Sequence, residues 1–199
     1  MEVQTTRSPV RTAATPGFVA ARTIVLVGLM GAGKTKIGRR LATRLNLPFS
    51  DSDNEIETAA GETIEDIFRR HGEAVFRDGE RRVIARLLMQ PKHILATGGG
   101  AFMDPLTREV IAQRGVSVWL RADLDVLLAR VLRRNNRPLL QHSDPRAVLA
   151  ELMERRHPIY AEADLVIDSG DAPVETTTSR VIAALRDCPR ALQEPVEEF

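Results

Sequence analysis

The sequence contains a single cysteine, Cys188, among 199 residues, which excludes an intramolecular disulfide. A reducing compartment such as the cytoplasm is the setting that this usage favours. The sequence also lacks any apolar run close to the roughly 20 residues that a membrane-spanning helix needs. An excess of one charge is missing too, because 28 Lys and Arg residues face 27 Asp and Glu residues. The overall charge therefore indicates neither nucleic acid nor an anionic membrane as a partner, and any anion site has to be local.

The two ends of the chain differ from its middle. Residues 1–21 have no hydrophobic periodicity and one acidic residue, Glu2, so we expect a disordered N-terminal extension. A short organellar transit peptide, rich in Arg and poor in acids, is an alternative interpretation of this stretch. Residues 187–199 are expected to form a loose C-terminal tail. The remaining length, 22–186, suits one α/β domain with a single core.

Between these ends, short apolar segments alternate with longer amphipathic ones. The short segments have the length and composition of β-strands, and they span residues 23–28, 47–51, 93–98, 116–120 and 164–169. The longer segments repeat apolar residues at i, i+3 and i+4 spacing, which is typical of helices with one buried face. Strands that are apolar on both faces and separated by helices predict a parallel sheet covered on both sides, a three-layer α/β/α arrangement.

The stretch VGLMGAGKTKIGRRL, residues 27–41, places a glycine-rich turn between the first predicted strand and the first predicted helix. Gly28, Gly33, Lys34 and Thr35 fit the pattern G-x-x-x-x-G-K-[ST] of a phosphate-binding P-loop. In such a loop, backbone N–H groups converge on phosphate oxygens, the helix N-terminus adds a positive partial charge, and the lysine contacts the transferred group. The threonine hydroxyl would hold Mg²⁺. The motif predicts a bound nucleotide but does not identify a second substrate.

Two other predicted strands end in candidate site residues. Asp51 and Asp53 follow the second strand, and in an extended segment their carboxylates point the same way. One could then order Mg²⁺ through water while the other accepts a hydroxyl proton; the alternative is that Asp53 only caps a helix beginning at Asn54. The third strand ends in three glycines, 98–100, instead of the aspartate usual in nucleotide-hydrolysing switches. Backbone would face the site there, unless the glycines form a plain flexible turn.

Several arginines lie where they could bind anions. Arg77 has Glu80 three residues further on, a spacing that lets the carboxylate hold the guanidinium, and Arg77 can then bind a substrate carboxylate. Between Asp125 and Asp144 there is no acidic residue, whereas four arginines fall there: Arg130, Arg133, Arg134 and Arg137. In a kinase this basic segment predicts a lid, about residues 126–144, that closes over phosphates and excludes water. A solvated helix end is the alternative.

The chain resembles the shikimate kinase family across roughly residues 22–186, through segments that occur in the family's order and at its separations. These are GLMGAGKTKIGRRLA, FSDSDNEIE, GETIEDIFRRHGEAVFR, TGGGAF, RPLL and MERRHPIY. The resemblance implies a nucleoside-monophosphate-kinase-like fold, with a five-stranded parallel sheet of order 2-3-1-4-5 and a mobile lid. It implies ATP-dependent phosphorylation of the 3-hydroxyl of shikimate, on the route to chorismate and the aromatic amino acids. We expect ATP and shikimate as partners, one Mg²⁺ ion as cofactor, and a cytoplasmic monomer that contacts neither nucleic acid nor membrane.

The resemblance also implies a shikimate-binding set. Asp53 matches the aspartate that hydrogen-bonds the shikimate hydroxyls and acts as the base. Arg77 and Arg156 match the pair that binds the shikimate carboxylate. Gly99 and Gly100 match the glycines whose backbone contacts a ring hydroxyl.

A second implied set surrounds the nucleotide and its metal. Arg137, in RPLL, matches the lid arginine that reaches the transferring phosphate, and Arg130 the arginine that lies against adenine. Asp51 matches the aspartate that helps to order Mg²⁺ through water, beside Thr35. The nucleotide-binding residues are then Gly31, Ala32, Gly33, Lys34, Thr35, Lys36, Arg130 and Arg137. The implied catalytic residues are Lys34, Asp53 and Arg137.

Two alternatives of different classes stay open on the sequence alone. Another small-molecule kinase of the same fold, acting on gluconate or a nucleoside monophosphate, gives no reason for the pair Arg77 and Arg156. A catalytically silent homologue that only binds nucleotide does not explain why Lys34, Asp53 and Arg137 are all present. The sequence departs from the family pattern at Thr97, where the family often has an apolar residue, and in the N-terminal extension.

Overall fold

The computed structural model describes residues 20–133 and 144–195, and these residues form a five-stranded parallel sheet of order β2-β3-β1-β4-β5. The strands are β1 Thr23–Val27, β2 Phe49–Asp51, β3 Ile94–Ala96, β4 Gly115–Arg121 and β5 Leu165–Asp168. Four of them lie within the ranges predicted from the sequence, and β4 extends the predicted range by one residue at each end. Both the strand positions and the order implied by the family resemblance are therefore confirmed.

The central strand β1 shows that the sheet is covered on both faces. All five of its residues are buried. Ile24 lies opposite Ile94 of β3 on one side and Val116 of β4 on the other, so both edges of β1 are paired. A strand without a polar face can be accommodated only where helices cover the sheet on both sides.

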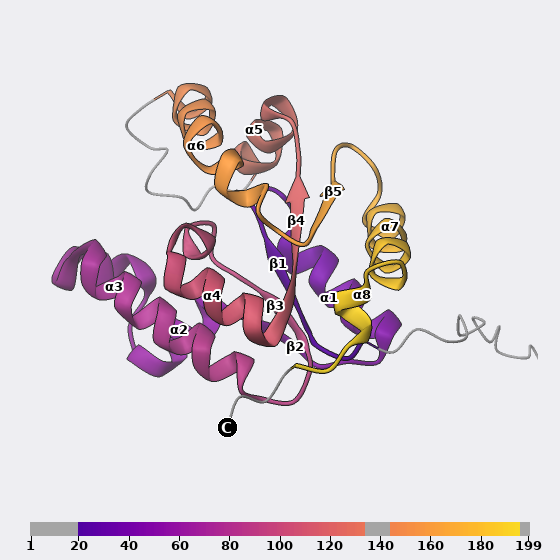
Figure 1. Ribbon diagram of the computed structural model, residues 1–199. Coiled ribbons are helices and arrows are strands. Elements are labelled where there is room, and N and C mark those ends of the chain that lie inside the picture. Colours follow the sequence, from indigo (N-terminus) through magenta and orange to yellow (C-terminus); the bar gives the residue numbers. More distant parts are fainter. Residues whose placement is uncertain (1–19, 134–143, 196–199) are drawn as a thin grey trace, which may run out of the picture.

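Helices form the two outer layers (Figure 1). They are α1 Lys34–Leu45, α2 Ser52–Ala60, α3 Ile64–Leu88, α4 Pro105–Arg114, α5 Leu124–Leu132, α6 Pro145–Tyr160, α7 Val174–Arg186 and α8 Pro189–Leu192, with a 3-10 turn, η1, at Ala101–Met103. α1 packs with α7 on one side of the sheet, and α3 packs with α4 on the other. α5 and α6 pack together near the carboxyl ends of the strands. The segments between the strands, predicted to be helical from their apolar periodicity, are thus confirmed as helices.

The C-terminal segment corrects one expectation. Residues 187–199 were expected to form a loose tail, but within that range Cys188 and Ala191 are buried and α8 packs beside α7 and β4. The Arg22 guanidinium, whose residue is only 8% exposed, donates to the carbonyl oxygens of Gln193 at 2.8 Å, Gln113 at 2.7 Å and Glu194 at 3.1 Å. These bonds hold residues 193 and 194 next to Arg22, because a buried guanidinium needs hydrogen-bond acceptors in place of the water that it has lost.

Other expectations fall on residues that the structure does not describe. The N-terminal extension lies outside the described residues except for its last two positions, of which Ala20 is buried. Of the expected lid, about residues 126–144, the structure describes residues 126–133, which belong to helix α5 and its C-cap Arg133, and Asp144. Residues 134–143, which include Arg134 and Arg137, lie outside the described residues. The lid therefore remains a prediction.

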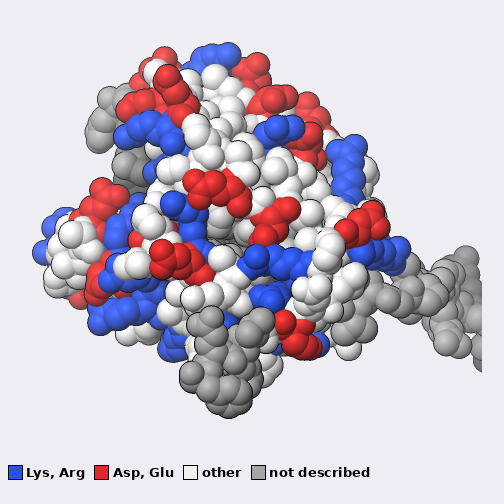
Figure 2. Space-filling model, in the orientation of Figure 1, with Lys and Arg blue, Asp and Glu red and all other residues white. Residues whose placement is uncertain are grey.

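Charges of both signs are mixed over the face of the molecule shown in Figure 2, as the near-balance of the composition leads one to expect. Among residues 20–133 and 144–195, no helix has both the length and the apolar character needed to cross a membrane.

Candidate active site

A cavity of about 410 Å³ opens where the first three strands end, at the carboxyl edge of the sheet. Ligands of parallel α/β sheets bind at this edge, because the loops that follow the strands converge there. Nine of the residues expected to form the site line the cavity: Gly31, Gly33, Lys34, Thr35, Lys36, Asp51, Asp53, Gly99 and Arg130. Segments far apart in the sequence therefore share one space.

The glycine-rich turn has the backbone geometry of an anion cradle. Gly28, Gly31 and Gly33 all have positive φ (134°, 84° and 95°), which side-chain-bearing residues rarely adopt. Gly33 is the N-cap of α1, and no side chain caps this helix end. The first-turn N–H groups are left to another acceptor, such as a phosphate. Lys34 folds back over the turn, and its Nζ donates to the carbonyl oxygens of Gly28 at 2.6 Å and Leu29 at 3.0 Å.

The two aspartates after β2 are arranged differently from the expectation. The segment does not stay extended; α2 begins at Ser52, and Asp51 is its N-cap, accepting from the backbone N–H of Asp53 at 3.2 Å. The alternative expectation, that Asp53 caps a helix beginning at Asn54, is wrong for the same reason. The Thr35 hydroxyl donates to Asp51 Oδ2 at 2.9 Å, which joins the P-loop helix to the end of β2. Asp51 and Asp53 both still line the cavity.

Arg77 is held by two carboxylates. Its Nη1 donates to Glu80 Oε2 at 2.6 Å, which confirms the i, i+3 pair expected from the sequence, and its Nη2 contacts Glu73 Oε1 at 3.2 Å. Glu80 is 2% exposed. Burial raises the pKa of the Glu80 carboxyl, and the positive charge of Arg77 opposes that shift. The two carboxylates therefore hold the Arg77 guanidinium in one place, beside the glycines that follow β3.

Gly98 lies between this pair and Asp53. A Cβ added at Gly98 would come within 2.7 Å of both Asp53 Oδ1 and Glu80 Oε1. The two carboxylates thus approach the same point of the backbone, and a side chain at this position would push into them. Arg77, Glu80 and Asp53 are in this way gathered at the end of β3.

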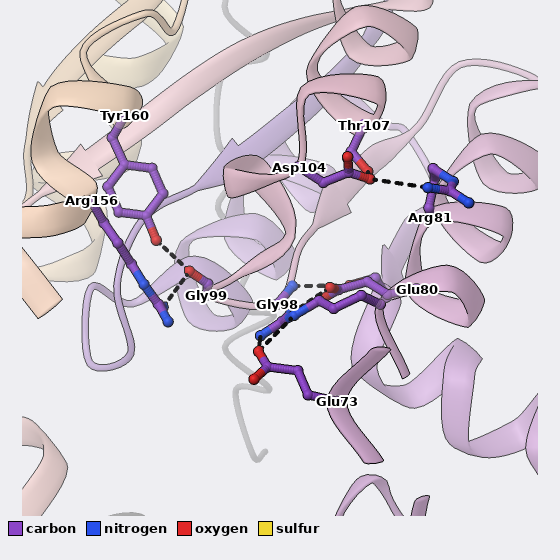
Figure 3. Close-up of polar contacts among 11 residues, drawn as sticks. Glu73, Glu80, Arg81, Gly98, Gly99, Asp104, Thr107, Arg156 and Tyr160 are labelled. Carbon is purple, nitrogen blue, oxygen red and sulfur yellow. Dashed lines mark hydrogen bonds and ion pairs between the residues drawn. The ribbon is translucent and has the colours of Figure 1, made fainter. Parts of the chain in front are cut away.

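Arg156 reaches the same glycine loop from α6. Its Nη1 donates to the carbonyl oxygen of Gly99 at 2.8 Å, and the side chain of Tyr160, one turn later, points at the same oxygen (Figure 3). On the other side of the loop, a Cβ at Gly100 would lie 2.5 Å from Arg77 Nη1. The two arginines expected to bind one carboxylate therefore flank residues 98–100.

Arg130 lines the cavity between the P-loop and the segment that follows β5. Its guanidinium donates to the carbonyl oxygens of Gly31 at 3.3 Å and Ser169 at 2.8 Å, and also to that of Gly170. Ser169 in turn donates from Oγ to the carbonyl oxygen of Ala32 at 3.0 Å. Ala32 is itself buried and contributes through this backbone group. The P-loop is thus tied to the segment after β5.

The comparison with known protein families identifies the chain. Residues 30–186 match the family model described as "Shikimate kinase". The chain belongs to the shikimate kinase family. The curated shikimate kinase of Paramagnetospirillum magneticum (strain ATCC 700264 / AMB-1) is 61% identical over 164 residues, which are 82% of this chain and 84% of that protein. A solved shikimate kinase from Acinetobacter baumannii, in complex with shikimate, superposes with a TM-score of 0.80 at 40% identity, over 83% of this chain and 93% of that one.

The family resemblance stated from the sequence is thus confirmed. A gluconokinase from Sinorhizobium meliloti 1021 also superposes, with a TM-score of 0.51 over 84% of this chain and 97% of that chain, but at 18% identity. That likeness concerns the P-loop fold alone and gives no support to gluconate as a substrate.

Three residues of this shikimate kinase site were not found from the sequence. Glu73 lies four residues before Arg77, so the i, i+4 spacing was a signal that could have found it. Tyr160 lies four residues after Arg156, on the same face of α6, and the spacing again offered a hint. Ser169 had no local signal, because its partner Ala32 is 137 positions away.

Proposed function

We propose that this chain transfers the γ-phosphoryl group of ATP to the 3-hydroxyl of shikimate and releases ADP and shikimate 3-phosphate. The observation that carries the proposal is the pair Arg77 and Arg156, which flank the glycine loop within reach of Asp53 and the P-loop cavity. A small substrate with a carboxylate at one end and hydroxyls at the other matches this arrangement. Nucleoside monophosphates carry no carboxylate and leave the paired guanidiniums less well explained. Gluconate does carry a carboxylate, and it is disfavoured because the gluconokinase is only 18% identical to this chain, whereas the shikimate kinase of Paramagnetospirillum magneticum is 61% identical.

The carboxylate end of shikimate binds to Arg77 and Arg156. Planar guanidiniums donate two parallel hydrogen bonds to a carboxylate, which orients the substrate as well as holding it. Arg77 is already held by Glu73 and Glu80, so little side-chain entropy is lost when the substrate arrives. The backbone of Gly99 and Gly100 contacts a ring hydroxyl.

The reacting hydroxyl lies near Asp53. Asp53 accepts the proton of the 3-hydroxyl while the hydroxyl oxygen forms a bond to the γ-phosphorus. The bond between that phosphorus and the bridging oxygen breaks, and its electrons leave with ADP. Phosphoryl transfer depends mainly on positioning and charge neutralisation, so a modest base is sufficient.

The phosphates bind at the N-terminus of α1. The N–H groups of residues 31–36 point at the phosphate oxygens and Lys34 contacts the transferred group. Arg130 lies against the base, near the segment after β5. Arg137, outside the described residues, reaches the transferring phosphate from the lid, about residues 126–144.

Thr35 and Asp51 suit one Mg²⁺ ion. The Thr35 hydroxyl and an Asp51 carboxylate oxygen lie 2.9 Å apart and supply hard oxygen ligands, one direct and one through water. Among the described residues, no group of three or more His, Cys, Asp or Glu residues could form a protein cage for a metal. That donor set fits Mg²⁺, which keeps several waters and relies on substrate phosphates. When bound, the ion would neutralise charge on the phosphates.

The enzyme is further proposed to act as a monomer in the cytoplasm. Its near-neutral charge and its one cysteine, buried beside α8, are compatible with that setting.

An ADP-release assay with shikimate, gluconate and AMP, run side by side at equal concentrations, tests the proposal. We expect shikimate alone to give sustained turnover and a product phosphorylated at the 3-hydroxyl, identified by NMR. Faster turnover of gluconate or AMP would replace the proposal with the same-fold alternative. Nucleotide binding without turnover of any acceptor would identify a silent homologue.

Lys34→Met tests the phosphate end of the site. The substitution removes the ammonium that faces the transferred phosphate, while the residue lies at the surface of the cavity and outside the apolar core. We expect kcat to fall by at least about 100-fold, comparable to the loss of a transition-state donor, with the circular dichroism spectrum unchanged. Turnover at the wild-type rate would contradict the assignment.

A further inference from the structure

The carbonyl oxygen of Gly99 accepts hydrogen bonds from two side chains of α6. Arg156 Nη1 lies 2.8 Å away, and the Tyr160 hydroxyl donates to the same oxygen at 2.5 Å (Figure 3). A carbonyl oxygen has two lone pairs, so it can accept both bonds at once. Arg156 is assigned to the substrate carboxylate, whereas Tyr160 has no assigned role.

The side chain of Tyr160 is held in place by burial and by the aromatic rings around it. The residue is 1% exposed, and its ring stacks on Trp119 with centroids 5.7 Å apart and on Phe102 with centroids 6.3 Å apart. Burial raises the pKa of its hydroxyl to about 12, although the charges of Arg156 and Arg77 act in the opposite direction. The hydroxyl therefore keeps its proton at neutral pH and remains a donor.

The glycine loop needs such a donor. Three consecutive glycines have the largest backbone freedom of any tripeptide, so their own preferences hold the loop in no single conformation. Gly99 is followed by Gly100, whose Cα lies so close to Arg77 that a Cβ would meet Nη1 at 2.5 Å and Nη2 at 2.6 Å. A shift of the Gly99 peptide would therefore also displace the backbone against which Arg77 rests.

We propose that Tyr160 is a positioning residue for shikimate, which fixes the carbonyl of Gly99 and through it the backbone between Arg77 and Arg156. The inference rests on the proposed function, because it assigns Tyr160 to the shikimate side of the site. When the Arg156 guanidinium turns to the substrate carboxylate, Tyr160 keeps its bond to Gly99. The loop then stays in place as the substrate binds.

Tyr160→Phe is the variant that tests this role, because it removes the hydroxyl and keeps the ring between Trp119 and Phe102. We expect the KM and the calorimetric Kd for shikimate to rise about 3- to 10-fold, the effect of one neutral hydrogen bond. The KM for ATP and the Kd for ADP should stay within about twofold. The fluorescence emission maximum of Trp119, the only tryptophan of the chain and buried beside Tyr160, should be unchanged and would show that its surroundings are kept.

Thr178→Val is the matched control. Thr178 is fully buried in α7, and its hydroxyl donates to the carbonyl oxygen of Val174 at 2.7 Å, so the variant also loses one buried hydroxyl-to-carbonyl bond. Thr178 does not line the nucleotide cavity. We expect Thr178→Val to lower Tm about as much as Tyr160→Phe and to leave both KM values unchanged.

The outcomes separate this inference from the function on which it rests. If wild-type protein binds shikimate and Tyr160→Phe binds it equally well, with only Tm lowered as in the control, the positioning role is overturned and the function stands. If Tyr160→Phe raises the KM values for both substrates alike, the residue is merely structural and the inference is again overturned. If wild-type protein neither binds nor phosphorylates shikimate, the proposed function fails, and the inference fails with it.

Discussion

Arg155 and Arg156 are neighbours in the sequence but have different surroundings. Successive residues of an α-helix are about 100° apart, so only one of the two can face a given site. The Arg155 side chain is 64% exposed and pairs with Glu151 of the same helix at 3.3 Å. Arg156 is half-buried and donates to the carbonyl oxygen of Gly99. The structure thus offers an internal control for the substrate-binding role proposed for Arg156.

Arg156→Ala should weaken shikimate binding by roughly 1.5–3 kcal/mol, the range for a hydrogen bond to a charged group, and should leave ADP binding nearly unchanged. Arg156→Lys should fall between wild type and alanine, because an ammonium keeps the charge but cannot form the planar pair of bonds. Isothermal titration calorimetry with each ligand measures both effects.

Arg155→Ala should bind shikimate like the wild type, since its only described ion pair is on the surface and such pairs contribute little. A large loss in Arg155→Ala, with Arg156→Ala unaffected, would mean that the wrong face of α6 has been assigned. No effect in either variant would mean that the carboxylate binds elsewhere.

Local spacing decided which site contacts could be predicted from the sequence. The P-loop and the pair Arg77–Glu80 lie within a few residues, so a motif and a helical spacing were enough to find them. The bond from Tyr160 to Gly99 joins residues 61 positions apart, and it depends on how α6 packs against the loop after β3. The cap formed by Asp51 was missed because the sequence does not show where β2 stops and α2 begins.

Among the secondary-structure elements, α3 has a feature that its sequence pattern does not reveal. The helix spans Ile64–Leu88, but Gly72 within it has φ 80° and ψ 171°, far from helical values. The element is therefore two helical segments joined at a kink, and the second segment carries Arg77 and Glu80. Only glycine adopts this region of backbone space at low cost, and another residue there stores strain of roughly 1–3 kcal/mol.

Gly72→Ala should lower the free energy of unfolding by roughly 1–3 kcal/mol, although a Cβ there would meet nothing within 4 Å. The cost is due to the backbone and not to crowding. Urea unfolding at equilibrium measures the change, and the m-value should stay the same because the buried surface does not change.

Gly79→Ala is the matched control within the same element. Gly79 has no positive φ, and a Cβ there also meets nothing within 4 Å. Alanine should therefore stabilise the protein by about 0.5–1 kcal/mol, the ordinary gain in a helix interior. If Gly72→Ala stabilised the protein as much as Gly79→Ala, the kink would be absent in solution.

In the molecule as a whole, the active site and the C-terminal segment lie at opposite edges of the sheet. The P-loop follows β1, so the site lies at the carboxyl edge of the sheet. Ala21 precedes β1, and its N–H donates to the carbonyl oxygen of Ala191 at 2.9 Å, so α8 lies at the amino edge. The sequence could not predict this packing, because four helical residues are too few to show a period, and Gln193, which follows them, is 171 positions away from its partner Arg22.

A chain that ends at residue 187 should therefore be less stable and still active. It loses the buried residues Cys188 and Ala191 and two of the three carbonyl acceptors of Arg22. A buried donor left without a partner costs about 1–3 kcal/mol and more when it is charged, so we expect unfolding to become easier by roughly 2–4 kcal/mol. At 25 °C, kcat and both KM values should stay within about twofold, since the site is at the other edge. A chain that ends at residue 195 keeps every described contact and should match the full chain in both respects.

Arg22→Met shows whether the guanidinium is the cause. It keeps an unbranched stem and removes the charge, so in the full chain it should destabilise the protein through the three lost bonds. In the chain that ends at residue 187, the same substitution should cost less, because two of those bonds are already gone and effects of residues in one network do not add. Equal costs in the two backgrounds would mean that Arg22 and the C-terminal segment stabilise the protein independently, and that the segment is held by the packing of α8 alone.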